Sequence, residues 1–358
     1  MRILWFNHRD IRHPLAGGAE RTIYEVGRRL AAGGHDVHLA TVNTGDLLRE
    51  EIIEDITIHR ANGNIRAHFM VPRLIKRLKP DIIVDDMAHV IPWCSTFFTD
   101  AKVIVFFRHL HARTLSGQAP QPLARILAWL ENLYPLIYHH SIFITETFTG
   151  IEDLLNLGVR NESIIKIPPG VDVELFHRGI KTEKPSLVYF GGMKQYKRPW
   201  LAVETLRMLS DIEGVTLAVV GDGNELSKIK EMAAAYCLTD RISFFGHLRR
   251  DELAEVVSTS WVNLHFSVAE GFGYSILEAA AAGIPTIAIN APGVTEVVNT
   301  FGLGIVVKNI NDILPALRKI VGNYEYWSSA VKTSAASFSW ERCAEMWQEL
   351  IIDAGKRT

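Results

Sequence analysis

The chain of 358 residues is 48% hydrophobic and 22% charged, and this is enough apolar sequence for two domains that each bury a full core. The composition excludes intrinsic disorder, a fibrous repeat and a small scaffold held by disulfides. The 38 basic and 40 acidic residues give a net charge of -2, so we expect no nucleic-acid partner, because such a partner requires a basic surface.

Short apolar runs alternate with helical patterns along the whole chain. Such runs are typical of strands buried on both faces of a parallel sheet, and the intervening helices make them βαβ units. The first series of expected strands is Ile3–Phe6, Val37–Val42, Ile56–His59, Ile82–Val84, Val103–Phe107 and Ile142–Ile144. The second series is Leu187–Phe190, Thr216–Val220, Ile242–Phe245, Trp261–Phe266, Thr286–Ile289 and Ile305–Val307. The two series predict an α/β protein with two Rossmann-like, doubly wound domains.

The pattern of strands and helices breaks at 176–186, where charged residues, Gly179 and Pro185 indicate a seam between domains. We therefore expect one domain over 1–178 and a second over 184–335, followed by a C-terminal helix over 336–358 that packs back toward the first domain. Open α/β domains bind ligands at the carboxyl ends of their strands, so the ligand is expected in the cleft that the two domains face.

The three cysteines and the N-terminal residues bear on the cellular compartment. Three is an odd number, and the wide spacing of the cysteines predicts buried thiols in a reducing compartment rather than disulfides or a zinc site. The apolar run at residues 1–6 is too short for a signal peptide, and no apolar stretch approaches the roughly 20 residues that span a bilayer. We expect a cytoplasmic protein.

Two segments leave peripheral contact with a membrane open. Arg73–Lys79 is basic and amphipathic, and a solvated helix face is the favoured interpretation. Leu123–Tyr138 is almost wholly apolar but contains Arg125 and Glu131, so a core helix and a lipid-facing helix are equally good interpretations.

Gly17 and Gly18 follow the first expected strand and precede a helix that we expect to start at Ala19. Glycine lets a backbone approach a ligand closely, and a helix N-terminus directs its N–H groups and positive dipole end at an anion. A diphosphate suits this position. The alternative is that the turn itself needs glycine.

A second glycine-rich loop, Gly191–Pro199, follows the first strand of the second domain. It carries three cations, and Lys197 is the best placed to neutralise a phosphate, with Lys194 or Arg198 assisting. The alternative is a solvated loop.

The segment Glu270–Ala280 follows an apolar strand and combines two acidic residues with a glycine turn and a helix start. Glu270 is expected in the loop and Glu278 in the first turn of the helix. The amides of residues 272–275 would face an anion while the carboxylates accept hydroxyl protons, a combination that suits a polyol joined to a phosphate. Ser275 and Glu278 also fit a capping box, the structural alternative for that pair.

The two glutamates, separated by seven residues, resemble the signature of glycosyltransferase family 4, the glycosyl transferases group 1. Members of this family are retaining enzymes with the two-domain GT-B fold. Further segments resemble family motifs in the family's order: Gly17–Arg21, Ile167–Asp172, Gly221–Gly223 and Pro292–Glu296. The resemblance implies a retaining transfer of a sugar from a nucleoside-diphosphate donor to a hydroxyl of a sugar, lipid-linked or small-molecule acceptor, in polysaccharide or glycolipid biosynthesis.

The resemblance also implies roles for individual residues. Lys197 would hold the diphosphate leaving group, Glu270 would face the transferred sugar, and His109 would be the active-site histidine, with a shift to His111 left open. The donor ligands that it implies are Gly17, Gly18, Lys194, Arg198, Phe272, Gly273, Tyr274, Ser275 and Glu278, of which Glu278 would bind the ribose.

The chain departs from the family pattern in ways that keep other interpretations open. Gly192 stands where the family has the arginine of its phosphate clamp, so Lys194 or Arg198 is expected to compensate. No Asp-x-Asp triplet occurs, and we expect neither a metal nor another cofactor. The alternatives are a non-catalytic nucleotide-sugar-binding protein, or another GT-B-shaped enzyme such as a phosphorylase or an epimerase.

Overall fold

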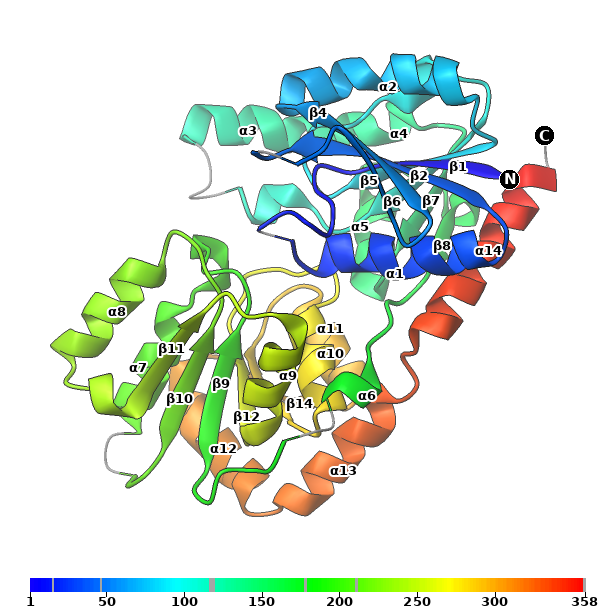
Figure 1. Cartoon of the computed structure of the whole chain (residues 1–358). Helices are drawn as coiled ribbons and strands as arrows, with labels where there is room; N and C mark the ends of the chain where they lie inside the picture. Colours follow the sequence, from blue (N-terminus) through cyan, green and yellow to red (C-terminus); the bar gives the residue numbers. More distant parts are fainter. Residues whose placement is uncertain (15, 46, 116–119, 177–178, 210–211, 357–358) are drawn as a thin grey trace. The chain divides into compact units, whose positions relative to one another are not determined.

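The computed structural model describes residues 1–14, 16–45, 47–115, 120–176, 179–209 and 212–356 (Figure 1). The chain forms two compact units. The N-terminal unit comprises Met1–Gly170 together with Trp340–Thr358, and the C-terminal unit comprises Val171–Ser339. Residues 177–178, where the sequence analysis ends the first domain, lie outside the described residues. The C-terminal helix, expected over 336–358, begins at Trp340.

The N-terminal unit is built on an eight-stranded sheet in the order β3-β4-β2-β1-β5-β6-β7-β8. Its strands are β1 (Arg2–Phe6), β2 (Asp36–Asn43), β3 (Glu50–Ile53), β4 (Ile56–Asn62), β5 (Ile82–Met87), β6 (Lys102–Phe107), β7 (Ile142–Thr145) and β8 (Ile164–Lys166). All neighbours are parallel except β3, which pairs with β4 in antiparallel register.

The side chains of β1 alternate between two apolar layers. Leu4 and Phe6 face a cluster that includes residues of α2 (Asn64–Leu78) and α4 (Tyr134–Ile137). Trp5 faces the other way, and its ring centroid lies 4.7 Å from that of Trp347 on α14 (Trp340–Lys356). The helix α14 runs beside α1 (Gly18–Ala32) (Figure 1). The remaining helices of this unit are α3 (Gln121–Leu130), α5 (Phe148–Leu157), η1 (Ser95–Phe97), η2 (His111–Arg113), η3 (Glu131–Leu133) and η4 (Asn161–Ser163).

The C-terminal unit is built on a six-stranded parallel sheet in the order β11-β10-β9-β12-β13-β14. Its strands are β9 (Ser186–Phe190), β10 (Thr216–Val220), β11 (Ile242–Gly246), β12 (Val262–His265), β13 (Thr286–Ile289) and β14 (Gly304–Val307).

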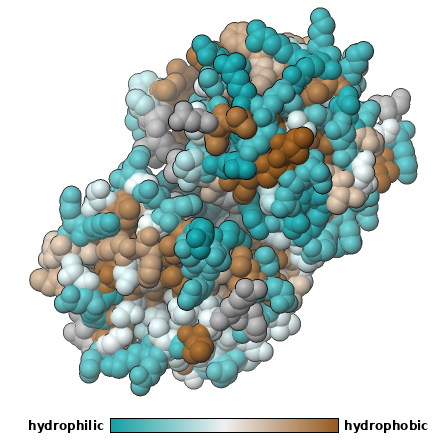
Figure 2. Space-filling model, viewed as in Figure 1, coloured by the Kyte–Doolittle hydropathy of each residue, from teal (hydrophilic) through white to brown (hydrophobic). Residues whose placement is uncertain are grey.

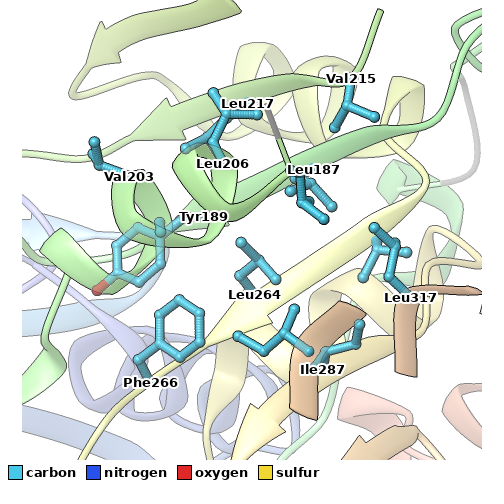
Figure 3. Packing of buried hydrophobic residues seen from close by; sticks show 14 of the residues in the cluster. Leu187, Tyr189, Val203, Leu206, Val215, Leu217, Leu264, Phe266, Ile287 and Leu317 are labelled. Atoms are coloured by element: carbon cyan, nitrogen blue, oxygen red, sulfur yellow. The ribbon is translucent and has the colours of Figure 1, made fainter. Parts of the chain in front are cut away.

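Both faces of this second sheet are buried. On one face Leu187, Tyr189, Leu217 and Leu264 point into a shared apolar layer (Figure 3). Val188 and Phe190, the alternate residues of β9, face a second cluster on the other side. The helices that form these layers are α6 (Val173–Phe176), α7 (Trp200–Met208), α8 (Leu226–Ala235), α9 (Arg250–Thr259), α10 (Tyr274–Ala281), α11 (Val294–Thr300), α12 (Ile313–Val321) and α13 (Tyr324–Ala335), with the short turns η5 (Gln195–Lys197), η6 (Thr239–Arg241) and η7 (Ile310–Asp312).

The predicted pair of doubly wound α/β domains is confirmed, and each of the twelve expected apolar runs coincides with a strand to within one residue at its start. Two strands were not predicted. β3 is a short edge strand whose burial alternates between exposed and intermediate residues, and β8 is only three residues long. Neither therefore contains the continuous apolar run that marks a buried parallel strand.

The two segments considered for membrane contact each contain both buried and exposed residues. In the C-terminal half of α2, Leu74 and Ile75 are buried while the cations around them are exposed, as expected for a solvated helix. Leu123–Tyr138 breaks into α3, η3 and α4, and its large buried side chains, Tyr134 and Tyr138, lie in its last part, with Ala124 the buried residue of α3. The exposed apolar side chains of this segment are Leu123, Ile126, Trp129 and Leu136.

The face that Figure 2 shows is mainly hydrophilic, with separate apolar groups between polar ones. Within the described part of the chain, no helix has the length and apolar character needed to cross a membrane. Peripheral membrane contact stays a prediction.

The cysteines correct one expectation. All three are free thiols, but only Cys343 is buried, whereas Cys94 is half-buried and Cys237 is exposed. Cys237 follows α8 in a left-handed backbone conformation with φ 55°, so it belongs to a surface turn and not to the core.

Candidate active site

The C-terminal sheet brings two predicted loops together at its topological switch point. The strand order reverses between β9 and β12, which are hydrogen-bonded neighbours. The loops that leave their carboxyl ends, residues 191–199 and 266–273, therefore start side by side at the position where open α/β sheets bind ligands. The amide of Val268 donates to the carbonyl of Tyr196 at 2.9 Å and ties the loops to each other.

Lys197 and Glu270 form an ion pair across these loops. The Lys197 Nζ lies 2.9 Å from Glu270 Oε1, and the side chains are only 21% and 14% exposed. Ser267 Oγ donates to the same carboxylate oxygen at 2.6 Å. The Tyr189 hydroxyl donates to the backbone carbonyl of Lys197 at 3.1 Å, so the sheet itself holds the lysine loop.

Both members of this pair stay charged at neutral pH. Burial acts to raise the pKa of Glu270, but the charge of Lys197, the nearby His265 ring and the hydrogen bonds from Lys197 and Ser267 outweigh it and lower the pKa to about 2. Burial also acts against the charge of Lys197, and the nearby Glu270 carboxylate reverses this effect and raises the pKa of the amine. The two loops thus hold a cation and an anion in fixed positions that are largely shielded from water.

His265, the last residue of β12, is a site residue that the sequence reasoning missed. Its Nε2 lies 3.6 Å from Glu270 Oε1, and its Nδ1 lies 3.2 Å from the Ser275 Oγ. Burial lowers the pKa of His265 to about 4, so the ring is neutral. Its position at the end of a strand is the sequence feature that could have identified it as a site residue.

The start of α10 overturns the capping-box alternative. Gly273 is the N-cap residue, with φ 86°, and no side chain caps the helix. Ser275 is the second helical residue and contacts His265. Glu278 lies in the second turn, not in the first as expected, because the helix begins at Tyr274. The first amides of the helix have no helical carbonyl to bind and remain an anion-receptive end.

The side chains of the two residues next to Gly273 differ in exposure. Phe272 is 1% exposed, and its ring packs against those of Phe301 and Phe338, so only its backbone is available to a ligand. Tyr274 is half-buried.

Glu278 forms an ion pair with Arg250, the first residue of α9. Arg250 also lies over the ring of Phe176, 5.1 Å from its centroid. The sequence reasoning missed Arg250 because nothing in its local pattern shows that α9 begins beside α10.

The two candidate replacements for the family's clamp arginine differ in their surroundings. The Nε of Arg198 donates to the carbonyl of Phe266 at 2.5 Å, and its Nη2 lies 3.4 Å from the carbonyl of Ser267. Arg198 therefore holds the glutamate loop in place. Lys194 is half-buried, and its Nζ lies 6.0 Å from the centroid of the Tyr196 ring.

In the N-terminal unit, Gly17 and Gly18 form the start of α1, one residue earlier than expected. Gly17 has φ -136° and ψ -152°, a conformation open to any residue, and its amide donates to Glu20 Oε2 at 2.7 Å. A Cβ at Gly17 would meet only that oxygen, at 3.7 Å. The turn therefore does not require glycine at residue 17, and this removes the structural alternative there.

His109 and His111 follow β6, and their ring centroids are 4.8 Å apart. His111 is buried, and Glu131 accepts hydrogen bonds from the amides of His111 and Ala112 at 2.7 and 2.9 Å. The sequence reasoning treated Glu131 only as a polar residue that interrupts an apolar segment. The contact could not be predicted from local sequence, because Glu131 lies 20 residues from His111 along the chain.

Among the described residues, no group of three or more His, Cys, Asp or Glu side chains is placed to hold a metal ion.

Comparison with known proteins extends over most of the chain. The family model of the glycosyl transferases group 1 matches residues 172–332, and that of glycosyltransferase family 4 matches residues 16–175. N-acetyl-alpha-D-glucosaminyl L-malate synthase of Bacillus anthracis is 24% identical over 308 residues, which are 80% of this chain and 79% of that protein. Sucrose-phosphate synthase of Thermosynechococcus elongatus has a similar structure, with a TM-score of 0.82 at 19% identity over 100% of both chains. HepE of Anabaena, solved in complex with UDP-glucose, has a TM-score of 0.78 at 15% identity over 99% of this chain and 100% of that one. The chain belongs to the group 1 glycosyltransferases of family 4, and its two parallel-sheet domains have the GT-B fold.

Proposed function

We propose that this glycosyltransferase is a retaining enzyme that uses a nucleoside-diphosphate sugar as donor and a hydroxyl group as acceptor. The observation that carries the proposal is the buried ion pair of Lys197 and Glu270 at the switch point of the C-terminal sheet. A fixed cation beside a fixed anion matches a reaction in which a diphosphate gains negative charge while the sugar carbon gains positive charge. The complex of HepE with UDP-glucose supports this class of donor.

The proposed step breaks the bond between the anomeric carbon and the diphosphate oxygen. The acceptor oxygen forms its bond to the same carbon on the same face, and the hydroxyl proton leaves with the diphosphate. Lys197 stabilises the charge that develops on the leaving group. Glu270 faces the sugar, and because its pKa is lowered to about 2 it remains an anion that stabilises the electron-poor carbon.

The other donor contacts follow from the elements around this pair. We assign the ribose hydroxyls to the carboxylate of Glu278, which Arg250 already orients. We assign the phosphate and sugar oxygens to the backbone amides of residues 272–275 at the start of α10. Gly17 and Gly18 keep their proposed role at the diphosphate, because the fold does not explain glycine at residue 17.

Lys194 is the better candidate for the charge of the missing clamp arginine. The guanidinium of Arg198 already binds two carbonyl groups of the glutamate loop, so moving it to a phosphate would release that loop. We propose that Lys197, Lys194 and helix N-termini stabilise the diphosphate without a divalent metal.

For the acceptor we propose a class of molecules, and for the location a cellular compartment. The Bacillus anthracis relative is an N-acetyl-alpha-D-glucosaminyl L-malate synthase, so we include a small hydroxylated acceptor beside glycans and lipid-linked sugars. We propose the cytoplasm as the compartment, because the three free cysteines suit a reducing environment.

The test measures sugar transfer by the full chain from UDP-glucose, UDP-N-acetylglucosamine and GDP-mannose to a panel of hydroxylated acceptors that includes L-malate. With the donor that supports transfer, we expect Lys197→Ala and Glu270→Ala each to lower kcat by about 10² to 10³. Lys184→Ala is the matched control, because Lys184 forms an exposed ion pair with Glu213 in the same unit. Thermal unfolding checks that the variants fold, and Lys197→Arg and Glu270→Gln provide conservative substitutions.

Three outcomes would contradict the proposal. Unchanged transfer in Lys197→Ala and Glu270→Ala removes the assigned roles. Tight binding of a nucleotide sugar without transfer to any acceptor supports a non-catalytic binding protein. A product whose anomeric configuration, read by NMR coupling constants, is opposite to that of the donor excludes a retaining mechanism.

A further inference from the structure

The N-terminal sheet has its own switch point, and histidines gather there. Its strand order reverses between β1 and β5. His8 follows β1, His89 and Trp93 follow β5, and His111 follows β6, so all four lie beyond the carboxyl ends of neighbouring strands. The His8 ring centroid lies 4.0 Å from that of His89 and 4.5 Å from that of Trp93. The unit therefore carries a cluster of imidazole and indole rings where open sheets bind ligands.

Two buried nitrogen atoms in this cluster have no hydrogen-bond partner among the described residues. They are Nδ1 of His8 and Nε2 of His111, whose residues are only 6% and 8% exposed. Buried polar atoms are nearly always paired, so two exceptions beyond the carboxyl ends of the same sheet need an explanation.

Glu131 fixes the orientation of His111. One carboxylate oxygen accepts the His111 amide at 2.7 Å and lies 3.3 Å from the ring Nδ1, and the other accepts the Ala112 amide at 2.9 Å. These contacts hold the first turn of η2, whose N-cap residue Leu110 has no side-chain cap of its own. A carboxylate beside Nδ1 favours the tautomer that carries its proton there, which leaves Nε2 as a hydrogen-bond acceptor.

Another buried histidine of the same unit, His59, contacts the exposed Glu50 and shows what a structural pair looks like. His59 Nδ1 lies 3.1 Å from Glu50 Oε1, and His59 Nε2 lies 3.0 Å from His38 Nδ1. Both ring nitrogens of His59 are therefore partnered within the fold. His111 differs in that only its glutamate side is partnered.

We propose that His111, oriented by Glu131, binds the hydroxyl group of the acceptor substrate through Nε2, with His8 Nδ1 lining the same subsite. Glu131 is a positioning residue, since it acts only through His111. The proposal rests on the proposed transfer function and shifts the acting imidazole from His109 to His111. An imidazole that presents an acceptor nitrogen suits a sugar or polyol hydroxyl, which donates one proton and is then free to use its lone pairs.

The kinetic test uses the donor and acceptor pair that gives transfer with the wild-type chain, taken from the panel above and extended with myo-inositol. We expect Glu131→Gln and His111→Asn to raise the acceptor KM about tenfold or more, because each removes a hydrogen bond to a buried group. The donor KM should change less than about twofold. Glu50→Gln is the matched control, and it should leave both constants unchanged. Equal effects on donor and acceptor KM, or none on either, would overturn the proposal.

A spectroscopic test keeps this inference separate from the transfer function. Long-range ¹H–¹⁵N correlation spectra of the ¹⁵N-labelled chain report the tautomer of each imidazole, and His111→Asn identifies the signal of His111. We expect the Nδ1–H tautomer in the wild type and a mixture of tautomers in Glu131→Gln. An Nε2–H tautomer in the wild type refutes the assignment whether or not sugar is transferred. If the tautomer is as expected but no donor supports transfer, the proposed function fails and the acceptor assignment fails with it.

Discussion

Glu270 keeps its charge in a buried position because Lys197, Ser267 and His265 surround one carboxylate oxygen. A buried carboxylate without such partners would be protonated near neutral pH. Breaking these contacts is energetically unfavourable. A donor that enters this site therefore meets a carboxylate that is already oriented and already ionised. This is the preorganisation that the proposed transfer requires.

The lowered pKa of Glu270 predicts a specific pH dependence of stability. A carboxylate whose pKa falls from 4.5 in the unfolded chain to about 2 in the folded one stabilises the fold above pH 4.5 and loses this contribution as the pH falls toward 2. The difference in unfolding free energy between the wild type and Glu270→Gln should therefore shrink by about 3 kcal/mol over this window. Urea unfolding at a series of pH values measures it. A difference that stays constant with pH would contradict the assignment.

The local sequence predicted the two residues that form the buried ion pair, but not the partners that come from other elements. Lys197 and Glu270 each follow a strand in a glycine-rich loop, so both were predictable, and parallel strands bring their loops to one edge. Arg250 reaches Glu278 from another helix, and Glu131 reaches His111 from the segment after α3. Such contacts depend on how helices pack, which no local pattern encodes.

At the scale of elements, the turn before α11 supports the glutamate loop. Gly293 has φ 76°, and a Cβ there would stand 2.0 Å from the carbonyl oxygen of Glu270. The Glu270 amide in turn donates to the carbonyl of Pro292 at 3.2 Å. The loop that carries Glu270 thus packs backbone to backbone on this turn, and only glycine allows that approach.

We predict that Gly293→Ala displaces the glutamate loop. Its Cβ cannot fit without moving a backbone carbonyl, so both the melting temperature and kcat should fall, with a loss of stability of about 1–3 kcal/mol or more. Gly302→Ala is the control, because Gly302 also has a positive φ, 63°, but no atom lies within 4 Å of its Cβ position. Thermal unfolding and transfer assays compare the two. If Gly302→Ala lowers kcat as much as Gly293→Ala does, backbone strain and not the contact with Glu270 is responsible.

The elements that the sequence predicted and those that it did not differ in burial. Twelve strands were predicted because both faces of a parallel sheet are covered. A strand buried on both faces is a continuous apolar run, which is easy to recognise in the sequence. The strand β3, at the antiparallel edge, and the three-residue β8 leave no such run. The capping box at Ser275 and Glu278 was wrong because Gly273, in a left-handed conformation, is the N-cap and the helix begins at Tyr274.

At the scale of the whole molecule, the chain leaves the N-terminal unit after Gly170 and returns to it at Trp340. A Cβ at Gly170 would stand 2.5 Å from the Trp340 amide nitrogen, so the outgoing and returning segments touch within this unit. The returning helix α14 then buries Trp347 completely against Trp5 and Phe106. The last helix is thus part of the hydrophobic core of the first unit, although it follows the second unit in sequence.

This division predicts that a change near the C-terminus destabilises the N-terminal unit alone. Trp347→Ala removes a side chain that is 0% exposed and should cost about 3–5 kcal/mol of stability in that unit. Hydrogen exchange followed by mass spectrometry should show lost protection in β1, β5 and β6, while β9, β10 and β12 of the C-terminal unit keep theirs, because local stability follows the contacts that each core retains. Trp129→Ala, in the same unit but at a side chain that is 58% exposed, is the matched control and should leave exchange unchanged. Equal loss of protection in both sheets after Trp347→Ala would mean that the two units unfold together, and α14 would then stabilise the whole chain and not one core.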